Sequence, residues 1–118
     1  MTSFKLDDMK RGWFVGDFSP TAFATDAAEV AVKTYRAGER EARHHHRQAT
    51  EITLVQSGAV EMNGQRHEAG AVIVIAPFES TDFHALADTV TVVVKVPGAR
   101  NDKYEGEYAG NESTGAAC

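Results

Sequence analysis

The segment Gly38–Gly58, with the sequence GEREARHHHRQATEITLVQSG, carries the most chemically distinctive residues of the chain. His44 and His46 are two positions apart, so on an extended strand both side chains leave the same face. Glu51 follows five residues after His46. Two imidazoles and a carboxylate form a donor set that binds one divalent transition metal. The segment therefore predicts a metal site, and the remaining sequence is expected to build a container around it.

The composition is that of one globular domain. The chain has 118 residues, 42% of them hydrophobic, and no apolar run is long enough to span a membrane. The N-terminus mixes charges and lacks the apolar region of a signal peptide. The single cysteine, Cys118, has no partner for an intramolecular disulfide, which fits a cytoplasmic location. The net charge is −5 and basic residues do not cluster, so we expect neither nucleic acid nor membrane as a partner.

Short strand patterns separated by turn residues occupy the middle of the chain. They cover residues 29–36, 50–57, 60–62, 65–67, 71–76, 80–87 and 89–96. Asn63-Gly64 predicts a two-residue type I′ hairpin turn, because both positions need a positive φ. Residues 39–43 are highly charged, and we expect them to be exposed. The pattern predicts an all-β sandwich or barrel.

The chain divides into three parts around this predicted barrel. Residues 1–28 form an N-terminal capping segment, in which Trp13 and neighbouring aromatic residues are expected to cover an open sheet face rather than stack on a ligand. Residues 29–97 form the barrel itself. Residues 98–118 are polar, glycine-rich and aperiodic, and we expect a partly disordered C-terminal tail, above all at residues 111–118.

A family resemblance rests on five matched positions at fixed spacing. The first motif of the cupins reads here as Gly38, five residues, His44, one residue, His46, four residues, Glu51, six residues and Gly58. The chain thus resembles a small single-domain cupin over residues 29–97. The resemblance implies a double-stranded β-helix, or jelly-roll barrel, in which the two histidines and the glutamate point inward and hold a metal. It also implies a homodimer, because small cupins are commonly dimers.

The spacing between His46 and Glu51 does not by itself bring their side chains to one face of a strand. His46 and Glu51 lie an odd number of residues apart, so on one unbroken strand they would face opposite ways. They converge only if residues 47–49 supply a turn or a bulge. The histidines would then end one strand, and the glutamate would lie on the next. His45 should point away from the metal, as a surface or supporting residue rather than a ligand.

The second cupin motif is degenerate in this sequence. The family pattern is glycine, five residues, proline, one residue, glycine, two residues and histidine; counted from Gly70, these positions hold Ala76, Phe78 and Thr81. Thr81 therefore takes the place of the fourth metal ligand. His84 lies three residues further on, on the opposite strand face, and is an additional ligand only if a bulge shifts the register.

Three interpretations of function remain open. The first is a metal-binding cupin enzyme, in which His44, His46 and Glu51 bind Fe, Mn, Ni or Zn for oxidation or isomerisation of a small polar metabolite. In the second, the protein resembles the metal-free sugar-nucleotide isomerases and epimerases of this family, and His44 or His46 is a general base. The third is a non-enzymatic module that binds a sugar or another small molecule.

Four side chains on or beside the predicted strands are suited to binding an anionic ligand, namely Lys33, Tyr35, Arg43 and Lys95. The pattern of residues 29–36 leaves open whether the Thr34 face or the Tyr35 face is inward. If Glu51 points inward, Ile52 and Leu54 lie on the barrel exterior. A second subunit would cover that apolar exterior in a homodimer.

Overall fold

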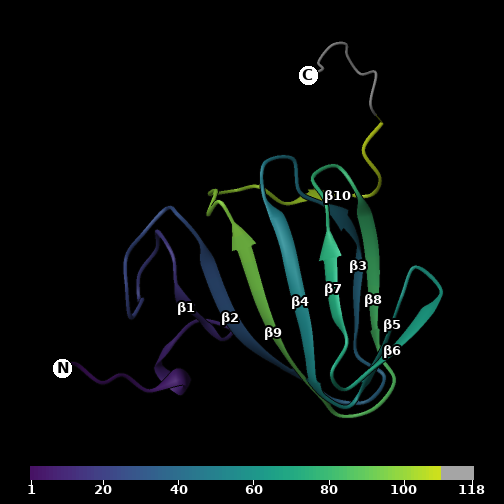
Figure 1. Cartoon of the computed structure of the whole chain (residues 1–118), viewed down its shortest axis with the longest axis horizontal. Helices are drawn as coiled ribbons and strands as arrows, with labels where there is room; N and C mark the ends of the chain where they lie inside the picture. Colours follow the sequence, from purple (N-terminus) through teal and green to yellow (C-terminus); the bar gives the residue numbers. More distant parts are fainter. Residues whose placement is uncertain (110–118) are drawn as a thin grey trace.

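The computed structural model of the chain describes residues 1–109 and shows an all-β protein with two antiparallel five-stranded sheets (Figure 1). The strand orders are β1-β2-β9-β4-β7 and β10-β3-β8-β5-β6. The elements are η1 (Leu6–Asp8), β1 (Trp13–Val15), β2 (Glu29–Tyr35), β3 (Arg40–His45), β4 (Thr50–Ser57), β5 (Ala59–Met62), β6 (Gln65–Glu68), β7 (Val72–Ile75), β8 (Ser80–Ala85), β9 (Thr89–Val96) and β10 (Tyr104–Glu105). This architecture confirms the predicted double-stranded β-helix. Within residues 1–109, no helix is long and apolar enough to cross a membrane.

Alternation along β4 decides which of its side chains face the space between the sheets. Glu51 and Thr53 line the interior cavity, and Val55 belongs to the buried core. Ile52 and Leu54 therefore lie on the outer face, as predicted.

Alternation along β2 shows which of its faces points inward, the Thr34 face or the Tyr35 face, which the sequence left open. Lys33 and Tyr35 line the interior cavity, Ala31 is fully buried and Thr34 is exposed. The Tyr35 ring packs against Phe83, with ring centroids 4.5 Å apart. The Tyr35 face of β2 is thus the inner face.

Apolar side chains fill one part of the space between the sheets and leave a cavity in the other. The buried core consists of Val55, Val60, Met62, Ile75, Phe83 and Ala85. Each such side chain stabilises the fold by roughly 1.5–3 kcal/mol when it is removed from water. Met62 and Phe83 also form the floor of a cavity of about 400 Å³. The core therefore fixes the depth of this cavity.

Two turns depend on residues with positive φ. The predicted hairpin between β5 and β6 is confirmed, with φ of 50° at Asn63 and 75° at Gly64. Gly58, the last position of the first cupin motif, has φ of 88°, and a Cβ atom there would collide with the backbone oxygen of Asp88. Only glycine fits this crossing between β4 and β5.

Both segments that flank the predicted barrel add a strand to it. β1 pairs with β2, and Trp13 turns inward to line the cavity rather than lying over the outer sheet face. β10 pairs with β3, opposite His44 and His45. The predicted disorder at residues 111–118 lies outside the described residues.

One expectation about exposure is wrong. Residues 40–43 belong to β3, and Glu41 and Arg43 are partly buried. Glu39, Arg40 and Ala42 are exposed as expected, but β3 places the Glu41 side chain on the cavity wall.

Candidate metal centre

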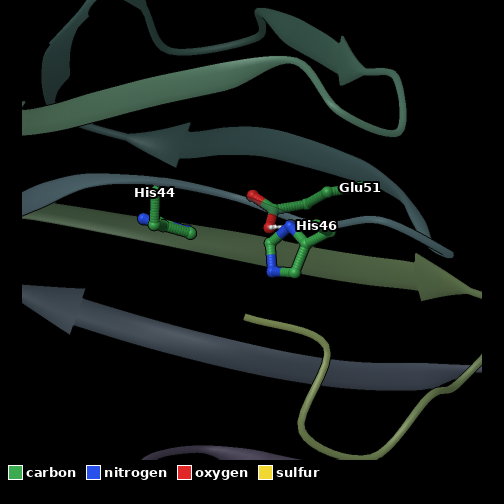
Figure 2. A group of neighbouring side chains, drawn as sticks. All are labelled: His44, His46 and Glu51. Carbon is green, nitrogen blue, oxygen red and sulfur yellow. Dashed lines mark ion pairs between the residues drawn. The ribbon is translucent and has the colours of Figure 1, made fainter. Parts of the chain in front are cut away.

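His44, His46 and Glu51 gather between the two sheets (Figure 2). One possible donor atom from each residue lies within 4.8 Å of the other two. His44 lies near the end of β3, His46 follows that strand, and Glu51 lies near the start of β4. The structure thus brings together the three residues that the sequence singled out.

A bulge in β3 aims His44 at this group. Glu41 pairs with Phe83 and His44 with Thr81, so the register shifts by one residue between the two pairs. The His44 Nδ1–H donates to the carbonyl of Ala42, at 3.1 Å. This bond orients the ring and leaves the Nε2 lone pair for a metal, as is common for histidine ligands.

A carboxylate from outside residues 29–97 holds the turn between His46 and Glu51. Asp102 is 5% exposed and accepts four hydrogen bonds of 2.8 to 3.2 Å from the backbone amides of residues 47–49. The chain bends at residues 47 and 48, which confirms the predicted turn. The role of Asp102 was not predicted, because no local pattern links residue 102 to residues 47–49.

Glu51 and His46 face each other across this turn. The Glu51 Oε1 lies 3.8 Å from the His46 Nδ1, and the Thr53 hydroxyl donates to the Glu51 Oε2 at 3.0 Å. His46 is 4% exposed, and its Nε2 has no hydrogen-bond partner within the described chain. Leaving a buried polar atom unpaired costs roughly 1–3 kcal/mol. A bound ligand at this nitrogen would remove that cost.

The protonation state of His46 suits a metal ligand. Burial, together with the nearby Lys95 and His44, lowers its pKa to about 4. His46 is therefore neutral near physiological pH, which is the form that coordinates a metal. Donor atoms bound to one ion at about 2.1 Å lie roughly 3–4 Å apart, so small side-chain rotations close the present gaps. The three residues fit a divalent transition metal.

The position of the fourth cupin ligand holds a residue that is already engaged. Thr81 is 6% exposed, pairs with His44 and lines the cavity, and its hydroxyl donates to the carbonyl of Asp82 at 2.7 Å. His84 lies on the other face of β8, since Thr81, Phe83 and Ala85 are its buried positions. The structure does not bring His84 to the metal group.

His45 points away from the metal group, as expected, but it is not a surface residue. It is 2% exposed, and its ring stacks on Tyr104 with centroids 5.4 Å apart. Its Nδ1–H donates to the carbonyl of Gly106 at 2.8 Å, and its Nε2 accepts from the Arg47 Nε at 3.2 Å. The segment around β10 therefore covers the outer side of β3.

Tyr35 and Glu41 form a second polar pair in the cavity. The Tyr35 hydroxyl donates to the Glu41 Oε2 at 2.8 Å, and the Lys33 Nζ lies 3.9 Å from the same oxygen. Burial raises the pKa of Tyr35, and the Glu41 carboxylate raises it further, so the phenol stays protonated. Arg43 does not line the cavity; it donates to the Ser80 hydroxyl at 3.1 Å.

Comparisons with known proteins agree with this fold. No protein-family model and no curated protein matches the chain. An uncharacterized double-stranded β-helix protein from Klebsiella pneumoniae has 24% identity and a TM-score of 0.64, covering 71% of this chain and 74% of that one. A cupin 2 conserved barrel domain protein from Salinispora arenicola has 20% identity and a TM-score of 0.52, covering 59% and 63%. The chain has the cupin fold. A pirin from Escherichia coli in complex with nickel(II) matches this cupin barrel with 14% identity and a TM-score of 0.63, covering 75% of this chain and 39% of the pirin.

Proposed function

We propose that this cupin is a metal-dependent enzyme that oxidises or isomerises a small polar metabolite. The observation that carries the proposal is the gathering of three possible metal donors, from His44, His46 and Glu51, within 4.8 Å of one another, where the buried His46 also has an unpartnered Nε2. His44 and Glu51 also line a cavity of about 400 Å³, which is large enough for a small metabolite. The nickel(II) held by the structurally similar pirin supports a metal in this fold.

Three protein donors leave coordination positions free for a substrate. Thr81, at the fourth position, gives its hydroxyl hydrogen to a backbone carbonyl. A divalent metal held by His44, His46 and Glu51 would polarise a substrate oxygen and acidify a neighbouring hydroxyl group or water.

Two residues are placed for proton transfer, Tyr35 on the inner face of β2 and Glu41 on the inner face of β3. The Glu41 carboxylate lies at the cavity wall, where it can accept a proton from the substrate. The protonated Tyr35 hydroxyl, 2.8 Å away, can supply a proton in return. Met62 and Phe83 give the same cavity an apolar part of its lining.

One observation favours a metal-free isomerase or epimerase as the second candidate. Tyr35 lies on the inner face, and the metal-free sugar-nucleotide isomerases and epimerases that the chain resembles use an inward histidine and a tyrosine. Against it, a pKa of about 4 makes His46 a weak base near neutral pH. The third candidate, a binding module without catalysis, needs neither proton-transfer group.

Metal analysis tests the leading proposal. Protein purified without chelators should contain about one Fe, Mn, Ni or Zn ion per chain, or bind one on titration. His46→Ala and Glu51→Gln should lose this ion while staying folded, whereas His67→Ala, on the β5–β6 hairpin, should keep it. If the purified protein holds no ion and none of the four metals binds, the protein is not a metal-dependent enzyme. A folded His46→Ala variant with unchanged turnover would also contradict the proposal.

A further inference from the structure

Basic side chains converge on the cavity of an acidic protein. The net charge of the chain is −5, yet five of its twelve Lys and Arg residues line the cavity, against four of its seventeen Asp and Glu residues. The basic lining residues are Lys10, Arg11, Lys33, Lys95 and Lys103, and the acidic ones are Glu29, Glu41, Glu51 and Asp82. Two of these carboxylates are engaged, Glu51 in the metal group and Glu41 with Tyr35. The lining is therefore cationic, and more so with a metal present.

The ammonium groups of two of these lysines lie beside the ring of the only tryptophan of the chain. The Nζ atoms of Lys95 and Lys33 lie 4.9 Å and 5.6 Å from the Trp13 ring centroid. Lys33 pairs with Thr91 on β9. Thr91 and Lys95 are four residues apart on that strand, so the backbone positions of the two lysines are separated by roughly 13 Å along it. The two side chains lean toward each other from these distant positions, and cation–π attraction to Trp13 holds them there.

Lys95 connects this pair of lysines to the metal group. It pairs with Glu51 across the β4–β9 ladder, so both side chains leave the same face of the sheet side by side. Its positive charge also acts on His46. A small molecule that reaches the metal group is therefore within reach of the Lys95 ammonium.

The Thr91 hydroxyl is, besides the His46 Nε2, a second buried polar atom that a bound ligand would satisfy. Thr91 is 1% exposed, lines the cavity next to Lys33, and its hydroxyl has no hydrogen-bond partner in the described part of the chain. The Lys33 Nζ lies 3.9 Å from the nearest carboxylate oxygen, which is too long for a hydrogen bond. Burial lowers the pKa of Lys33, and the Glu41 carboxylate offsets only part of this effect. Donors thus face the cavity without an adequate acceptor.

We propose that Lys33, Thr91 and Lys95 form a subsite for the carboxylate of a small organic acid whose other end reaches the metal group. Two ammonium groups and one hydroxyl match the two oxygens and single negative charge of a carboxylate. Phosphate groups are commonly held by backbone amides at a helix N-terminus or in a nest, and this subsite consists of strand side chains. The inference rests on the proposed function because it names the substrate class, but its test needs no metal.

Fluorescence of the single tryptophan provides a direct assay, since Trp13 touches both lysines. Succinate added at constant ionic strength should change the Trp13 emission with saturation. Its neutral diamide, succinamide, should have no effect, because the lysines recognise charge. Binding should persist in the presence of a metal chelator.

Matched variants separate the subsite from general charge effects. Lys33→Met and Lys95→Met should each weaken succinate binding at least about tenfold, a change worth 1.4 kcal/mol. Lys5→Met removes the same charge from an exposed position outside the cavity and should leave the affinity unchanged. Thr91→Val should weaken binding several-fold while its Tm stays at or above that of the parent, because the valine removes a buried unpaired hydroxyl. A purely structural role for Thr91 would lower the Tm and leave binding intact.

Several outcomes would overturn the subsite. These are equal responses to succinate and succinamide, saturable binding of inorganic phosphate but not of succinate, and unchanged affinity in Lys33→Met and Lys95→Met. Loss of succinate binding on chelation would show that the metal, not the lysines, binds the anion. If the protein binds no metal but still binds succinate through these residues, the proposed function fails and the subsite stands.

Discussion

Replacing Asp102 tests whether a residue far along the chain holds the metal group together. Asp102 lies after β9, outside residues 29–97, yet both its carboxylate oxygens accept backbone amides of the turn before Glu51. Asp102→Ala removes this acceptor without adding bulk. We expect it to destabilise the fold and to weaken metal binding, because the turn sets the direction of Glu51 relative to His46.

The size of the effect follows from the burial of the three amides. Hydrogen bonds to a charged group contribute roughly 1.5–3 kcal/mol each. Ala49 is 1% exposed and Arg47 is partly buried, so neither amide gains full hydration when the carboxylate is removed. Gln48 is exposed, and its amide can bond to water instead. Counting two amides gives a loss of about 3–6 kcal/mol, a large share of the roughly 5–15 kcal/mol that stabilises a domain.

Urea unfolding followed by circular dichroism measures this loss, with the m-value checked for constancy. Asp102→Asn, which keeps one carbonyl oxygen, should fall between Asp102→Ala and the parent. The control is Asp88→Ala, which removes a single bond, 2.9 Å long, to the amide of Ala37 at the far end of β3 and should cost less than about 1 kcal/mol. If Asp102→Ala unfolds within about 1 kcal/mol of the parent and binds metal equally well, the turn does not depend on Asp102.

Three further predictions concern the fourth ligand position, the lysine pair and the outer sheet face. Thr81→His should raise Zn²⁺ affinity by more than about tenfold and reduce turnover, because a fourth protein donor closes a tetrahedral site; unchanged affinity in a calorimetric titration would show that position 81 lies out of reach of the metal. Succinate affinity, measured by Trp13 fluorescence, should fall with rising pH below the range where ordinary lysines deprotonate, because burial lowers the pKa of Lys33 and the anion needs the ammonium form. Lys33→Met should lose most of that pH dependence. Ile52→Asp should convert a homodimer into monomers in light scattering, since the outer face also exposes Val72 and Val74 by 60% and 61%; a variant with the parent's mass and stability would contradict this interface.

The fold could be predicted because its determinants are local. Alternation in residues 50–57 put Glu51 and Ile52 on opposite faces, the cupin resemblance implied that Glu51 points inward, and Asn63-Gly64 predicted one hairpin by its backbone conformation. The parity of His46 and Glu51 required a turn between them, and the structure has a bend there. The motif spacing therefore identified the three residues, and the cupin resemblance implied the inward convergence that the structure shows.

The missed features depend on contacts between segments far apart in the sequence. Glu41 was expected to be exposed because a bulge at residues 42–43 cannot be read from the sequence, and this bulge brings Glu41 and His44 to the same face. Trp13 was expected to cover a sheet, and pairing of β1 with β2 turned it toward the cavity. His45 was placed away from the metal correctly, but its cover, Tyr104, lies in a segment without any periodic pattern.

The two segments outside the motif-bearing barrel therefore determine what the cavity can do. The barrel supplies the metal donors and the lysines, as its strand alternation dictates. The N-terminal segment brings Trp13 to the point where Lys33 and Lys95 meet, which concentrates positive charge at one place in the cavity. The C-terminal segment brings Asp102 under the turn that carries Glu51. A barrel cut to residues 29–97 would keep the cupin motif but lose Asp102, which holds the turn before Glu51, and Trp13, which contacts Lys33 and Lys95.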